Sequence, residues 1–109
     1  MAYSEELAGR IRVELIAREG YVEKKMFGGI CFMLKGNMAC GIVGDFLIAR
    51  VGPVKYAEAL DEPHAALFDF TGRPMTGWVK VAPEGWNAET DLKKWVQMGV
   101  DYALSLPPK

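Results

Sequence analysis

The sequence is poor in the side chains that build most metal centres and nucleophilic sites. It has a single histidine, His64, and two cysteines, Cys31 and Cys40, among its 109 residues. Disulfide scaffolds and thiolate metal sites need more cysteines, and one histidine supplies no metal cluster. His64 follows Pro63 in a segment expected to be an exposed loop, so a solvated side chain is a better interpretation than a general base. We therefore expect no metal and no cofactor.

Catalytic sequence motifs are missing as well. None of the serines and threonines lies in the pattern of a nucleophile elbow. The adjacent glycines Gly28 and Gly29 lack the flanking residues of a dinucleotide fingerprint or of a Walker loop, so close backbone approach or a β-bulge explains them better. We expect a protein without enzymatic activity, with a small-ligand-binding protein or enzyme as an alternative.

Neither an excess of one charge nor a long apolar run is present. Thirteen basic and fourteen acidic side chains give a formal charge of −1, whereas sequence-independent binding of nucleic acid relies on many Lys and Arg contacts to phosphates. Nucleic acid therefore stays an alternative partner that the charge does not indicate. No stretch is long and apolar enough to span a bilayer, and the acidic N-terminus is unlike a secretory signal. We expect a cytoplasmic protein without membrane contact.

What the sequence does contain is a block of strand-forming residues between positions 25 and 51. The dipeptides Gly36-Asn37 and Gly44-Asp45 within it are typical of tight hairpin turns. Apolar and small residues flank both turns, which predicts three consecutive antiparallel strands. These strands are expected over residues 30–34, 38–43 and 46–51.

Two-residue turns would fix the register of this meander. They place Met33 opposite Cys40 and Gly41 opposite Ile48, and both sheet faces then consist mainly of apolar residues, although a solvated face should alternate with polar ones. We expect helices to cover one face and the other face, or its edge, to form a homodimer contact or a partner groove; the alternative is that the helices wrap further around. Cys31 and Cys40 become diagonal neighbours on one face, beyond disulfide reach, and are expected to be buried thiols.

The flanking segments predict three helices and further strands. Leu7, Ile11 and Leu15 recur every four residues after the N-cap candidate Ser4, which predicts a helix over residues 4–19. A short helix should follow Pro53, and a last helix should begin at an Asn87 cap and bury Leu92, Trp95, Val96, Gly99, Ala103 and Leu106. Additional strands are expected over residues 21–25, 67–70 and 77–81.

These elements describe one α+β domain over residues 1–109. Their order is helix, three or four strands, helix, two strands, helix. Antiparallel strands with helices on one face make a two-layer domain, so we expect a sheet of five to six strands with three helices.

The segment from Arg73 to Trp78 is the most unusual one outside the meander. A loop arginine beside methionine and aromatic side chains, here Arg73, Met75 and Trp78, could recognise an anion or a protein partner. The interpretation we favour is nevertheless a turn between strands whose Trp78 packs into the core. Arg50, at the margin of one apolar face, completes the set of candidate interaction residues.

Two motifs resemble the TfoX N-terminal domain family. They are Lys25-Met26-Phe27-Gly28-Gly29 with the hairpins that follow, and the segment 72–79, which includes Gly77. The resemblance implies a strongly bent antiparallel sheet in a two-layer α+β fold similar to that of secretion chaperones, and it implies no catalytic residues. We take Met26, Phe27, Gly28, Gly29 and Gly77 as structural motif residues.

The resemblance also implies a class of function. The namesake regulators of natural transformation act with the cyclic-AMP receptor protein and carry a second, C-terminal domain that these 109 residues do not include. We therefore expect a short stand-alone member, acting as a non-catalytic protein-interaction or regulatory module related to competence. A direct nucleic-acid-binding transcriptional regulator is the alternative.

Overall fold

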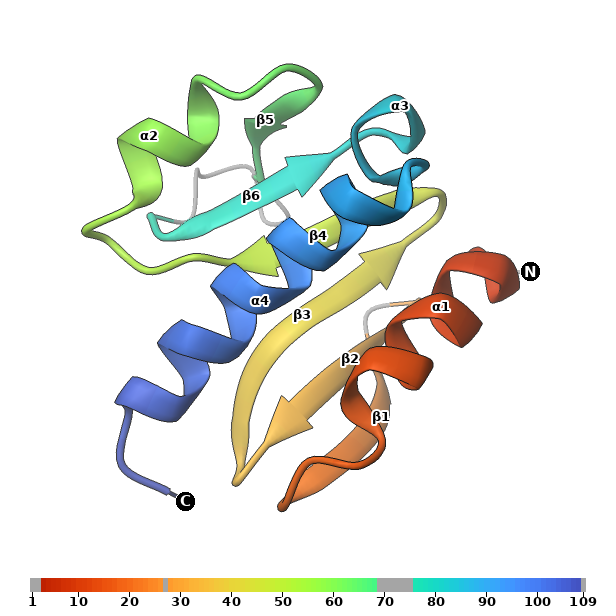
Figure 1. Cartoon of the computed structure of the whole chain (residues 1–109), viewed down its shortest axis with the longest axis vertical. Coiled ribbons are helices and arrows are strands. Elements are labelled where there is room, and N and C mark those ends of the chain that lie inside the picture. The colour runs from red at the N-terminus through yellow and green to blue at the C-terminus, as the bar shows by residue number, and fades with distance from the viewer. Residues whose placement is uncertain (1–2, 27, 69–75, 109) are drawn as a thin grey trace.

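The computed structural model describes residues 3–26, 28–68 and 76–108. Four consecutive strands follow the first helix, and Figure 1 shows α1 and α4 lying across the same side of the sheet. In chain order the elements are α1 (Glu5–Leu15), β1 (Tyr21–Met26), β2 (Gly29–Leu34), β3 (Asn37–Val43), β4 (Phe46–Arg50), α2 (Tyr56–Leu60), β5 (Ala65–Leu67), β6 (Trp78–Val81), α3 (Pro83–Trp86) and α4 (Glu89–Ser105).

The strands of the described residues form one sheet in the order β1-β2-β3-β4-β6-β5, and every neighbouring pair is antiparallel. After β4 the chain passes through α2, forms the edge strand β5 and returns as β6 beside β4. With helices on one face, this confirms the predicted two-layer α+β architecture. The described residues contain one more helix than predicted, because α3 occupies a segment for which no element was predicted.

Helix α1 begins as predicted but ends earlier. The Ser4 hydroxyl accepts a hydrogen bond from the Leu7 amide at 3.2 Å, which confirms the N-cap. The helix stops at Leu15 rather than at residue 19. Beyond Leu15 the next positions on the buried stripe are Arg18 and Glu19, which offer no apolar side chain to the core.

The start of α4 also differs from the prediction. Asn87 is the C-cap of α3, and Ala88 is the N-cap of α4 without a side-chain hydrogen bond. Proline is well suited to a first helical turn, and Pro83 begins α3 in this way. Strand β5 spans Ala65–Leu67 and shares only Leu67 with the predicted range of 67–70; Phe68 lies beyond the strand, and residues 69–70 lie outside the described part of the chain.

One hairpin of the meander has a different register from the predicted one. Gly41 faces Ile48 as expected. In the β2–β3 hairpin, however, Met33 faces Met38 and Phe32 faces Cys40, so Ala39 is an extra residue in a β-bulge. The extra residue shifts the in-and-out alternation of β3 by one position relative to β2, so Cys31 and Cys40 lie on opposite faces of the sheet. Both are buried free thiols.

The bulge has a consequence for burial, because it aligns the largest apolar side chains of β2 with Cys40 and Ile42 of β3 on the inner face, under the helices. The outer face is more mixed than the two apolar faces expected from the sequence. It has buried residues at its centre, such as Ile48, but cationic and aromatic side chains toward its ends. The buried inner-face residues are Ile30, Phe32, Leu34, Cys40, Ile42, Leu47, Ala49, Val79 and Val81.

Helix α4 covers the inner face along strands β2, β3 and β4. It approaches β3 so closely at Gly99 that a Cβ there would overlap the carbonyl oxygen of Ala39. Beyond the helix, the carbonyl of Pro107 accepts a hydrogen bond of 2.9 Å from the side chain of buried Asn37, at the start of β3. The segment from α4 to Pro107 therefore closes the inner face.

Helix α1 is joined to the edge strand β1 by a bidentate ion pair. The Arg12 guanidinium donates from Nε and Nη2 to the Glu23 carboxylate, at 2.6 and 2.9 Å. The hydroxyl of Tyr21 donates to the same carboxylate. The hydrogen bonds from Arg12 are the main reason why the pKa of Glu23 falls from an ordinary 4.5 to about 2.

We predict that Glu23→Gln removes part of the acid sensitivity of the fold. Because the pKa of Glu23 is lowered by folding, its stabilisation is complete above about pH 4.5 and is lost as the pH falls toward 2. At neutral pH the variant should be about 1 kcal/mol less stable than the wild type, and the gap should close in acid.

Urea unfolding at several pH values measures this gap. Glu58→Gln is the matched control, since Glu58 is exposed on α2 and has no ion pair among the described residues. A gap for Glu23→Gln that stays constant from neutral pH to pH ~2.5 would show that the ion pair does not carry the acid dependence.

Candidate interaction site

Two of the predicted interaction residues lie side by side on the outer face. Arg50 and Trp78 face each other at the end of the β4–β6 ladder. The guanidinium carbon of Arg50 lies 5.1 Å from the centroid of the Trp78 ring and 5.2 Å from that of Tyr102, on α4. All three side chains are half-buried. We call these residues the Arg50 cluster.

The backbone beside the cluster is shaped by glycines. Gly52 has a φ of +86°, and a Cβ at this position would overlap the Tyr102 ring. The amides of Val51 and Gly52 both donate to the carbonyl of Gly77, at 2.8 and 3.1 Å. This connection holds the end of β4 against the start of β6, so the glycines bring Tyr102 within reach of Arg50.

The hydrogen bonding of Arg50 differs from that of the other described arginines. Arg10 donates to a backbone carbonyl, Arg12 to the Glu23 carboxylate and Arg18 to the side-chain oxygen of Gln97. Arg50 has two aromatic neighbours but no hydrogen-bond acceptor and no carboxylate within ion-pair distance in the described parts of the chain. Its N–H groups are therefore available to a ligand.

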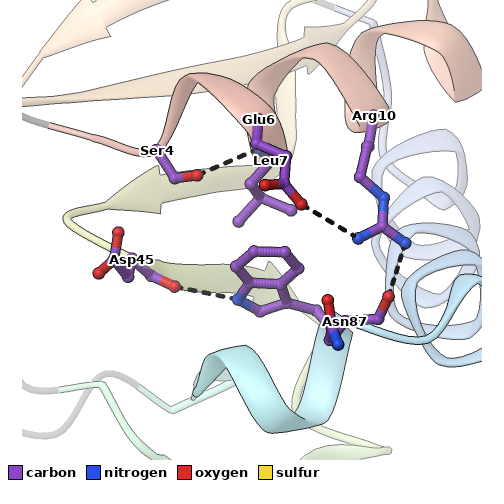
Figure 2. A network of polar contacts seen from close by, with 7 residues as sticks. Ser4, Glu6, Leu7, Arg10, Asp45 and Asn87 are labelled. Atoms are coloured by element: carbon purple, nitrogen blue, oxygen red, sulfur yellow. Dashed lines mark hydrogen bonds and ion pairs between the residues drawn. The ribbon is translucent and has the colours of Figure 1, made fainter.

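Arg10 provides the closest comparison, because it also lies over an aromatic ring. Its guanidinium carbon is 5.7 Å from the Trp86 ring centroid, but its nitrogens reach the Asn87 carbonyl at 2.9 Å and the Glu6 carboxylate at 4.0 Å, as Figure 2 shows. The Trp86 indole in turn donates to the Asp45 carbonyl at 3.0 Å. This network joins α1, α3 and the β3–β4 turn, so it is structural.

The remaining predicted interaction residues, Arg73 and Met75, lie outside the described residues. Trp78 is described, and the favoured interpretation, in which it packs into the core, is wrong. It lies half-buried on the outer face, with the ring of Phe68 at 6.5 Å between centroids. Sequence reasoning missed Tyr102, because its neighbours Gly99 and Ala103 belong to the buried stripe and only the tertiary fold brings it to Arg50.

Of the structural motif residues, Met26, Gly28 and Gly29 lie where β1 turns into β2, whereas Gly77 lies beside the Arg50 cluster. Gly28 turns the chain between β1 and β2 with a φ of +75°. A Cβ at Gly29 would overlap the carbonyl oxygen of Ile42, so close backbone approach explains this glycine. Gly29 pairs with Met26 in the ladder, and Phe27 lies outside the described residues.

The charged side chains at the described outer-face strand positions are all basic. The outer-face strand positions carry Lys24, Arg50 and Lys80, and no Asp or Glu occupies such a position in the described strands. The ammonium of Lys80 lies 4.8 Å from the centroid of the exposed Phe46 ring. Although the whole chain is almost neutral, this face is basic and partly aromatic.

The residue types suited to catalysis are not assembled in the described ranges. His64 is exposed, as predicted. Burial raises the pKa of the Cys40 thiol to about 12 and also raises that of Cys31, so neither is an activated nucleophile. No group of three or more His, Cys, Asp or Glu side chains that could hold a metal ion occurs among the residues described. None of the described helices has both the length and the apolar character needed to cross a membrane.

Comparison with protein families agrees with the resemblance noted in the sequence. The model of the TfoX N-terminal domain matches residues 14–103, which span every element from β1 through α3, most of α4 and only the last two residues of α1. This chain belongs to the TfoX N-terminal domain family. The family is a competence-related regulatory one. No curated protein and no solved structure matches the chain significantly.

The TfoX N-terminal domain model includes all three residues of the Arg50 cluster. Since Arg50 interacts with both rings, we predict a measurable coupling between Arg50 and Tyr102. Arg50→Gln and Tyr102→Leu should each destabilise the fold modestly, and the double-mutant cycle should give a coupling free energy of about 0.5–1 kcal/mol.

Urea unfolding of the four proteins in the cycle measures this coupling. A cycle of Arg18→Gln with Tyr102→Leu serves as the control, because the structure shows no contact between these two side chains. Additive effects in the Arg50 cycle would show that the stacking seen here does not stabilise the protein.

Proposed function

We propose that this protein is a small cytoplasmic, non-catalytic regulatory module that binds another protein through the Arg50 cluster. The observation that carries the proposal is the half-buried Arg50, held against two aromatic rings and left without an acceptor in the described residues. A cation in this setting gains most from a partner that brings its own acceptor. The relation to competence regulators gives the module its regulatory class.

The composition of the cluster supports a protein partner. Trp, Tyr and Arg are the residue types most enriched in the energetic hot spots of protein interfaces. Here one of each converges from three elements, β4, β6 and α4. Packing against one another lowers the rotamer entropy that each side chain would lose on binding. A different protein is the proposed partner, and a second copy of this chain is the alternative.

Arg50→Gln should therefore weaken capture of the partner by roughly tenfold or more. Tagged wild-type protein is used to isolate the partner from native lysate, and calorimetry with the purified partner measures the dissociation constant. Arg18→Gln is the matched control, since it removes an exposed arginine outside the cluster. Light scattering of the protein alone distinguishes a second copy from a different partner.

Equal affinity of the wild type and Arg50→Gln would contradict the proposal. Equal circular dichroism spectra of the variants show that a loss of affinity does not come from unfolding. A partner that binds both arginine variants equally uses another surface.

A second candidate function is direct binding of nucleic acid, and one observation favours it. The outer face carries Lys24, Arg50 and Lys80, of which Arg50 and Lys80 lie near aromatic rings, and its described strand positions carry no acidic side chain. Cations near aromatic rings are typical of surfaces that bind single strands. Three cations are few for a sequence-independent surface, so we rank this function second.

Fluorescence anisotropy with labelled single- and double-stranded DNA tests this candidate. Binding should weaken steeply as salt is added, and the Lys24→Gln/Lys80→Gln variant should have a smaller salt slope than the wild type. No complex at low salt, around 20 mM, would eliminate the nucleic-acid function.

A further inference from the structure

We infer that Arg50 binds a carboxylate of an acidic protein segment, with a glutamate or aspartate side chain as the ligand. This inference rests on the proposed interaction function and goes further, because it names the chemistry that the partner must present. The structure supports it through the donors of Arg50, which meet no acceptor among the described residues, the rings that position the guanidinium, and the charges around it.

The donors of Arg50 match a carboxylate in number and geometry. A guanidinium has five N–H donors in a planar fork that pairs two parallel hydrogen bonds with a carboxylate. In the described parts of the chain these donors meet no acceptor, whereas Arg12 places the same fork on Glu23 with two bonds of 2.6 and 2.9 Å. The Arg12–Glu23 pair therefore shows, in this same molecule, the geometry that we infer for Arg50.

The rings of Trp78 and Tyr102 preorganise the Arg50 side chain for binding. Both centroids lie close to 5 Å from the guanidinium carbon, so the side chain is oriented before a ligand arrives. Partial burial also removes water from the guanidinium, which strengthens a later ion pair. The cost of ordering a long, flexible side chain is thus largely met within the free protein.

The surroundings favour a single acidic side chain over a phosphate backbone. The other outer-face cations are engaged or remote: Lys80 lies over the Phe46 ring, and Lys24 lies on the edge strand β1. One isolated arginine cannot follow a row of phosphates. Near the cluster, Val54 follows Gly52 by two residues with 94% of its surface exposed, so it can contact an apolar residue beside the bound acid.

NMR observation of the cluster tests this inference. The Nε–H resonance of Arg50 and the indole N–H resonance of Trp78 report binding directly. Three probes are titrated into the wild-type protein: a blocked tripeptide of glutamate between two leucines, the same tripeptide with glutamine, and a single strand of eight thymidines. We expect saturable shifts with the glutamate peptide and a dissociation constant roughly tenfold or more weaker with the glutamine peptide.

Variants and pH refine the result. Arg50→Gln should abolish the Trp78 shift, Arg50→Lys should retain only part of the affinity because it lacks the planar fork, and Arg18→Gln should bind normally. Binding should weaken as the pH falls through the pKa of the peptide glutamate, near ~4.3. A dispersed amide spectrum shows that each variant is folded.

Three outcomes would overturn the inference: equal binding of the glutamine peptide, shifts with the thymidine strand only, or no shift with any probe. Failure of the proposed function is a separate result. If partner capture depends on Arg50 while the glutamate peptide does not bind, the interaction function stands and the carboxylate assignment is wrong. If the peptide binds Arg50 while partner capture ignores Arg50→Gln, the carboxylate site stands and the proposed function is wrong.

Discussion

The close approach of α4 to β3 is the constraint on which the rest of the structure depends. It requires a residue without a side chain at Gly99, next to the backbone of the bulged Ala39. The bulge in turn aligns β2 with β3 so that their side chains under α4 are mainly apolar. Tyr102 lies one helical turn beyond Gly99 and reaches Arg50 from there. The close packing at Gly99 in the core thus determines the position of Tyr102 in the Arg50 cluster.

The described arginines have different roles on the two faces of the molecule. Arg10 and Arg12 are used on the helical side, where they join α1 to α3 and to β1. Arg50 is the described arginine whose donors meet no acceptor among the described residues, and it lies where three elements meet. This contrast separates residues that hold the domain together from residues that are free to recognise another molecule.

The structural features that depend on interactions between residues close in sequence were predicted correctly. The Ser4 cap, the buried stripe of α1 and the β3–β4 register follow from capping, periodicity and a tight turn, and the structure has each of them. The bulge at Ala39 was not predictable from the turn dipeptide, because it depends on matching β2 and β3 under α4. Arg50 and Trp78 were identified from their composition, whereas Tyr102 depends on a contact between distant elements.

The order of elements along the chain also has a consequence for how the protein is made. The strands of the meander come early, but the helix that covers most of their inner face comes last, and Asn37 meets its Pro107 acceptor only at the end. During synthesis an apolar sheet face is therefore complete before its cover exists. Folding must wait for long-range contacts, and the nascent chain carries an aggregation-prone surface until α4 leaves the ribosome.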